Sequence, residues 1–202
     1  DSSRLLKQEA ALKKARLIFF DGKYEEAKSW FTRLGAYKNS EMWLANTLFM
    51  KGEAGQAWQF YSAKRPYDLS GFDPVTLLCM GDAAYTMRDY GFSREVYGHL
   101  NSRYKKDELI GTFFELRGAD AHLAEGHKDD ALRIYEKAKD RLSGEGWAVA
   151  ALSLADALAQ ENLPEPSAKA EAIYAGVSEG GHLGSEYAIL SKAAMAARLG
   201  RH

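Results

Sequence analysis

Hydrophobic and small residues recur along this chain at a spacing that predicts helices joined in pairs by tight turns. One recurring phrase consists of a turn, a helix carrying a small residue, and an aromatic residue four positions later. The small residues are Ala27, Ala57, Ser93 and Ala131, and the aromatic residues are Phe31, Tyr61, Tyr97 and Tyr135. Successive copies lie 30, 36 and 38 residues apart. Self-similarity at such a period predicts a stacked array of repeats rather than one globular core.

A second phrase precedes the last three copies of the first and also follows the fourth. It consists of a small residue, a polar residue and another small-bodied residue, and it occupies 45–47, 81–83, 119–121 and 155–157. Small residues at these positions let two helices approach closely, and a larger side chain would overpack the contact at a cost of roughly 1–3 kcal/mol. The repeating unit is therefore predicted to be a helix, a tight turn and a second helix.

These residues resemble the tetratricopeptide repeat family, whose unit of 34 residues carries the same small, aromatic and turn pattern. The resemblance covers about nine-tenths of the chain. It implies an all-α fold, an α-solenoid or right-handed superhelix of about five helix–turn–helix repeats plus a C-terminal helix. The family's closing proline is absent after most units, and Arg88-Asp89 stands in a turn where glycine is usual.

The whole chain, 1–202, is expected to form a single array within a longer protein. Its units are expected at about 5–37, 38–72, 73–106, 107–144 and 145–180, with a terminal helix at 185–200. That last helix is either a cap or half of a truncated repeat. Truncation is favoured, because its alanine-rich face carries few charges for a cap that must meet water.

The pattern predicts about eleven helices and no strands, since valine and isoleucine are sparse and no stretch alternates apolar with polar residues. Asp73 and Asp107 are expected to cap helices, and Pro74 to occupy a first helical position. The segment 143–146 is expected to break the chain, and 162–166 to lengthen the fifth turn. The expected helices are about 5–20, 23–34, 39–51, 53–64, 74–87, 90–104, 108–125, 128–142, 147–160, 167–177 and 185–199.

Composition narrows the classes of function. The chain has 202 residues, of which 46% are hydrophobic, enough for a continuous core. Its 27 basic and 28 acidic residues give a net charge of -1, which argues against a general nucleic-acid binder. No apolar run approaches the ~20 residues of a membrane-spanning helix, so no direct membrane insertion is expected. Soluble locations in the cytoplasm and in the bacterial periplasm both stay open.

Signatures of catalysis are weak. The glycine-rich segment 180–184 follows a predicted helix and lacks the strand–loop–helix setting of a phosphate-binding turn. His122 and His127 are separated by a predicted turn, so they do not share a helix face as zinc ligands would. The carboxylate pairs at 25–26 and 129–130 fall in first helical turns, where the helix dipole favours negative charge. The chain is therefore predicted not to be an enzyme and to use no cofactor or metal, and its lone Cys79 to be a small core residue.

A surface for recognition remains. In the tetratricopeptide family the first helix of each pair lines a concave groove, and the middle residue of the small triplet faces it. By resemblance these positions here are Arg16, Asn46, Asp82, Asp120 and Asp156. Three consecutive aspartates would favour a partner carrying lysine or arginine. The alternative is that each aspartate hydrogen-bonds the neighbouring repeat or is simply solvated.

A second stripe lies three residues after each polar position, on the same helix face. Its aromatic members are Phe19, Phe49 and Tyr85, followed by Leu123 and Ala159. The aromatic end is expected either to anchor an apolar or helical segment of a partner or to serve ordinary packing between helices.

Two functions follow. The leading hypothesis is a protein-interaction scaffold that binds a partner peptide or helix in its concave groove. The alternative is a structural or assembly spacer of a larger repeat protein, such as those of bacterial cell-envelope secretion systems, or a module that self-associates through its open ends.

Overall fold

The computed structural model describes residues 2–63, 68–161, 163–182 and 184–198. Within these ranges the chain forms eleven α-helices and two short 3₁₀ turns, with no strand. The all-α prediction is confirmed. The chain divides into two compact units, Asp1–Leu100 and Asn101–His202, which are described separately below.

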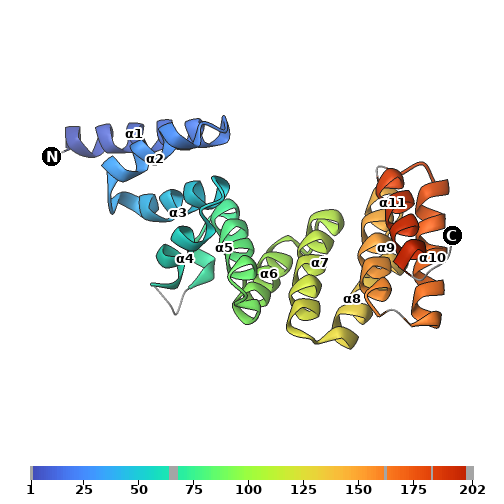
Figure 1. The fold of residues 1–202 in the computed structure, drawn as a ribbon. Coiled ribbons are helices and arrows are strands. Elements are labelled where there is room, and N and C mark those ends of the chain that lie inside the picture. The colour runs from blue at the N-terminus through green and yellow to red at the C-terminus, as the bar shows by residue number, and fades with distance from the viewer. Residues whose placement is uncertain (1, 64–67, 162, 183, 199–202) are drawn as a thin grey trace. The chain divides into compact units, whose positions relative to one another are not determined.

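The first unit holds five helices and most of a sixth, with pairs of consecutive helices joined by tight turns (Figure 1). The helices are α1 (Ser2–Phe20), α2 (Tyr24–Leu34), α3 (Ser40–Met50), α4 (Ala54–Ser62), α5 (Pro74–Thr86) and α6 (Tyr90–Tyr104). Neighbours in sequence pack together from α1 to α5, and α3 also contacts α1 and α5. The first helices of successive pairs therefore touch one another, as they do when helix pairs stack.

The second unit repeats this arrangement. Its helices are α7 (Glu108–Glu125), α8 (Lys128–Arg141), α9 (Gly144–Ala159), α10 (Pro164–Glu179) and α11 (Ser185–Arg198). Each packs on the next, and α9 also contacts α7 and α11. Contacts mainly between adjacent helices, with an added contact between every second helix, are those of a helical-repeat or solenoid-like arrangement.

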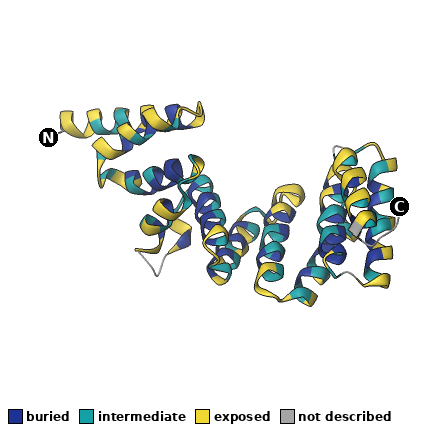
Figure 2. Cartoon of the chain, in the orientation of Figure 1, coloured by how far each residue is buried: buried dark blue, intermediate teal, exposed yellow. Residues whose placement is uncertain are grey.

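The small residues of the two sequence phrases lie where helices meet. Ala83, Ala119 and Ala155 are completely buried, and the buried positions form one side of most helices (Figure 2). At Gly81 an added Cβ would lie 3.1 Å from the Tyr97 ring and 3.3 Å from a methyl group of Val96. This contact between α5 and α6 has no room for a larger residue, as the small triplet predicted.

Local signals set the helix starts. The Asp73 carboxylate accepts a hydrogen bond from the Thr76 amide at 3.0 Å, and Pro74 occupies the first turn of α5. The Asp107 carboxylate accepts one from the Ile110 amide, also at 3.0 Å. Both predicted caps are confirmed, and each satisfies one of the free amides at a helix start.

Arg88 takes the left-handed conformation that glycine takes in the corresponding turns. Its φ is +63°, against +84° at Gly52 and +91° at Gly126. The third turn therefore keeps its shape without glycine, at a steric cost of roughly 1–2 kcal/mol for a residue with a Cβ.

Three predicted helix starts were wrong by three residues. Helix α1 begins at Ser2 rather than 5. Helix α9 begins at Gly144 rather than 147, so the expected break at 143–146 lies largely within the helix. Helix α10 begins at Pro164 rather than 167, because proline lacks an amide hydrogen and fits a first helical turn without loss. Asn162, part of the expected long turn, lies outside the described residues.

Candidate functional site

A hydrogen bond joins the two helices of a pair within each of four repeats. The middle residue of the small triplet, on the first helix, accepts a hydrogen bond from a buried tyrosine hydroxyl on the second helix. The pairs are Tyr61–Asn46 (2.6 Å), Tyr97–Asp82, Tyr135–Asp120 (2.7 Å) and Tyr174–Asp156 (2.6 Å). The first repeat has Arg16 and Phe31 at these positions, and the Arg16 guanidinium lies over the Trp43 ring instead.

The polar residue of each pair suits the degree to which its position is buried. Asn46 is fully buried, and its amide nitrogen also donates a hydrogen bond to the Thr76 hydroxyl on α5 at 2.9 Å. Asp82, Asp120 and Asp156 are only half-buried. A neutral amide suits the closed position and carboxylates suit the wetter ones, because burying a charge costs far more than burying a hydrogen-bonded amide.

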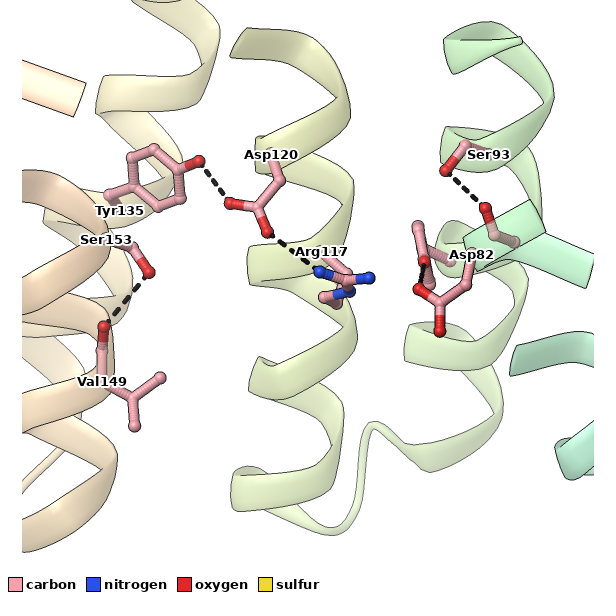
Figure 3. A network of polar contacts seen from close by, with 9 residues as sticks. Asp82, Ser93, Arg117, Asp120, Tyr135, Val149 and Ser153 are labelled. Atoms are coloured by element: carbon pink, nitrogen blue, oxygen red, sulfur yellow. Dashed lines mark hydrogen bonds and ion pairs between the residues drawn. The ribbon is translucent and has the colours of Figure 1, made fainter. Parts of the chain in front are cut away.

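Asp120 shows the electrostatics of these carboxylates (Figure 3). One oxygen accepts the Tyr135 hydroxyl, and the other lies 3.6 Å from the Arg117 guanidinium one turn earlier on α7. Burial raises the pKa of Asp120, and the nearby Asp156 carboxylate adds to this rise, against the hydrogen bond from Tyr135 and the charge of Arg117. Ionised Asp120 therefore carries a cost in the folded chain.

Replacing this carboxylate by an amide is expected to stabilise the fold. Asp120→Asn keeps an acceptor for Tyr135 and removes the cost of the buried charge, for a gain below about 1 kcal/mol at neutral pH. Because the pKa of Asp120 is raised in the folded chain, the gain in stability is full at pH values above that folded pKa. The gain shrinks as pH falls through the folded pKa, and it vanishes below the pKa of an aspartate in the unfolded chain, about 4.

Thermal melts of wild type and Asp120→Asn across this pH range measure the difference. Asp140→Asn, a change at a well-exposed carboxylate, is the control and is expected to stay within about 0.5 kcal/mol of wild type. A constant offset for Asp120→Asn at every pH would contradict the role given to burial.

Asp156 binds two helices at once. One carboxylate oxygen accepts the Tyr174 hydroxyl from α10, and the other accepts the Tyr187 hydroxyl from α11 at 2.7 Å. The hydrogen bond to Asp156 raises the pKa of Tyr187. Both oxygens therefore help hold the second unit together, and a part in selecting a basic partner stays a prediction.

The aromatic residues of the second stripe differ in how far they are buried. Phe19 is buried, with its ring edge-on to the Trp43 ring at a centroid distance of 5.3 Å. Phe49 and Tyr85 are half-buried, and the Tyr85 ring packs edge-on against Tyr90 at 5.4 Å. Phe19 therefore lies in the core of the first unit, while Phe49 and Tyr85 keep part of their surface open.

The second unit contains an apolar hollow that the sequence analysis did not identify. It has a volume of about 310 Å³ and lies between the first turns of α7 and α9. Its lining comprises Leu109, Ile110, Thr112, Phe113, Leu116, Leu142, Glu145, Gly146 and Val149. Four of these are unusually exposed for large apolar side chains: Leu109 63%, Ile110 41%, Phe113 46% and Val149 51%.

The positions of the two helices follow from small residues. A Cβ at Gly146 would lie 3.3 Å from Leu109 Cδ1 and 3.4 Å from Leu142 Cδ1, so glycine at position 146 eases the close approach of the first turn of α9 to these side chains. Phe113 and Val149 each stand seven residues, about two turns, before Asp120 and Asp156. The hollow and these two carboxylates therefore lie on the same face of α7 and α9.

The described residues offer little support for metal binding, thiol chemistry or membrane spanning. No cluster of three or more histidine, cysteine, aspartate or glutamate side chains there is arranged to hold a metal ion. Burial raises the pKa of the Cys79 thiol to about 12, which keeps it protonated and unreactive at neutral pH. Among the described helices, none combines the length and apolar character needed to cross a bilayer.

The sequence matches no protein-family model and shows no significant similarity to a curated protein.

Proposed function

We propose that this chain is a non-catalytic scaffold of the tetratricopeptide type. Its second unit binds a segment of a partner protein on the face formed by α7 and α9. The apolar hollow holds one or more apolar side chains of that segment. Asp120 and Asp156, farther along the same face, favour a segment that also carries lysine or arginine.

The observation that carries this proposal is the gathering of exposed apolar side chains around one hollow. Single exposed apolar residues are ordinary on protein surfaces, whereas a contiguous apolar patch marks a site of interaction. Leu109, Phe113 and Val149 come from two helices and converge on the same concave spot. A partner side chain that enters it would be screened from water on several sides, the setting in which binding hot spots occur.

Asp120 and Asp156 make one end of this face acidic. Glu145 is the one charged residue among those that line the hollow. Asp120 and Asp156 keep part of their surface open although both accept tyrosine hydroxyls. The face thus offers an apolar end and an acidic end about two helical turns apart, which suits an extended or helical segment with an apolar anchor followed by a basic residue.

Affinity capture with three forms of the chain tests this proposal. Phe113→Glu combined with Val149→Glu places two charges in the hollow, while both positions are exposed enough for the fold to tolerate them. Leu163→Glu adds one charge at an equally exposed apolar residue outside the hollow and is the matched control. Partners retained by wild type and by the control are expected to be lost from the double variant, with at least a tenfold drop in recovery.

Circular dichroism melts check that the double variant remains folded. Equal recovery of every captured protein by all three forms would overturn the proposal, as would loss from the control and the double variant alike.

A further inference from the structure

Helix α1 has a second apolar seam on the side opposite its core contacts. Leu12, Ala15 and Phe19 are buried against the rest of the first unit. The other side shows Leu6, Ala10, Lys13 and Leu17, at successive spacings of four, three and four residues. Phe20 continues this spacing at the end of the helix, where its ring also meets the edge of the Trp43 ring at a centroid distance of 5.8 Å. All five are exposed, with Leu6 at 70%, Leu17 at 67% and Phe20 at 59%.

This spacing is that of a helix that packs along another helix. An ordinary surface helix carries one apolar stripe toward its core and polar residues elsewhere. Alternating steps of four and three keep a stripe in line over several turns, which is the condition for lengthwise packing of two helices. Leu6 and Leu17 supply side chains to interlock, and Ala10 between them allows the backbones to come close.

The charge on α1 restricts what fits there. The helix carries Arg4, Lys7, Lys13, Lys14 and Arg16 against a single carboxylate, Glu9. Glu9 is already engaged, because it accepts hydrogen bonds from the Lys38 ammonium at 2.5 Å and from the Tyr37 hydroxyl at 3.0 Å. The seam is therefore set in a positive field, with Lys13 at its midpoint.

We propose that the outer face of α1 docks an amphipathic helix of a partner protein whose apolar stripe is flanked by glutamate and aspartate. One acidic residue of that helix pairs with Lys13, and its leucine-like residues pack between Leu6 and Leu17. A second copy of this chain fits poorly, since it would bring two such cationic helices together. This site is separate from the hollow in the second unit and does not depend on it.

Lys13, in the middle of the seam, also favours a partner helix over a lipid surface as the occupant. A helix that lies in a membrane interface sinks its whole apolar face into the acyl boundary and keeps its cations at the edge. Lys13 lies within the stripe, between Ala10 and Leu17, where a carboxylate on a facing helix reaches it directly.

Binding of synthetic helical peptides to the full chain tests the proposal. The probe is a labelled peptide of about three heptads with leucine at the two seam positions and glutamate beside them. Its matched control carries lysine in place of each glutamate. Fluorescence anisotropy is expected to show binding of the acidic peptide, weakening as salt is raised, and no binding of the basic peptide.

Substitutions on α1 test whether the acidic peptide binds to this helix. Leu17→Glu and Lys13→Glu are each expected to weaken binding of the acidic peptide at least tenfold, and Leu6→Glu serves as a second seam variant. Lys137→Glu, at an exposed lysine of α8, makes the same charge change elsewhere and is expected to leave binding unchanged. All variants should keep the wild-type helical content, because these side chains are exposed.

Three results would overturn the proposal. They are equal binding of the acidic peptide by wild type and the seam variants, absence of binding by wild type, and loss of binding in Lys137→Glu as well. Binding of wild type to anionic phosphatidylserine vesicles without binding to the peptide would assign the seam to a membrane. Concentration-dependent dimerisation that Leu17→Glu abolishes would assign it to a second copy.

Discussion

Trp43→Ala is expected to destabilise the first unit by about 3–5 kcal/mol, the largest effect of any single substitution considered for this chain. Trp43 is 3% exposed and belongs to the core cluster formed by α1, α2 and α3. Its ring stacks on Phe31 at a centroid distance of 6.0 Å and meets the edge of Phe19 at 5.3 Å. Truncation to alanine leaves a cavity that three separate helices would have to close.

Urea unfolding followed by circular dichroism measures this change as a shift of the transition midpoint. Trp30→Ala is the matched control, because Trp30 on α2 is only partly buried at the edge of the same cluster, and the Lys14 and Arg33 side chains lie over its ring. The control is expected to cost about 1 kcal/mol. Equal shifts for the two variants would contradict a core role for Trp43.

Most of the fold followed from local signals in the sequence. Turn glycines, the caps at Asp73 and Asp107, and the recurring small residues each act within a few positions, so they can be recognised without knowing the fold. The errors arose where a residue has two uses. Gly146 resembled a helix breaker, but it lies within α9, where an added Cβ would meet Leu109 Cδ1 of α7 at 3.3 Å.

The candidate site was less accessible to sequence reasoning. The aromatic residue of one phrase and the polar residue of the other were both recognised, yet not the hydrogen bond between them, which depends on how two helices face each other. The hollow was missed because Phe113 and Val149 lie on neighbouring helices and stand seven positions before the residues that drew attention. A search of each helix face over two full turns would have found both positions.

The burial of Phe19 and Asn46 also depends on contacts between repeats. Phe19 packs on Trp43, and Asn46 bonds to Thr76 from a later helix. Position on a helix face alone does not separate residues that line a groove from residues covered by the next repeat. Their nomination as partner-binding residues stays a prediction, as it does for Phe49, Asp82 and Tyr85.

Asn46→Leu is expected to destabilise the first unit by about 1–3 kcal/mol, although it exchanges a polar residue for an apolar one of similar size. The substitution removes the acceptor of the Tyr61 hydroxyl, which is completely buried, and the donor to Thr76. Thr76 keeps its hydrogen bond to the Asp73 carboxylate at 2.8 Å, so the main cost falls on the buried Tyr61 hydroxyl, which loses its Asn46 acceptor.

A double-mutant cycle separates this cost from simple misfit. Tyr61→Phe alone is expected to cost about 1 kcal/mol, because it removes the donor and leaves the Asn46 carbonyl oxygen without it. In the double variant neither partner remains, so its loss of unfolding free energy is expected to be smaller than the sum of the two single losses. Additive losses in urea unfolding would mean that the Tyr61–Asn46 hydrogen bond contributes nothing, and that leucine at position 46 destabilises through its shape. The same cycle at Tyr135 and Asp120 is expected to give a weaker coupling, because Asp120 is partly exposed and water can replace the lost partner.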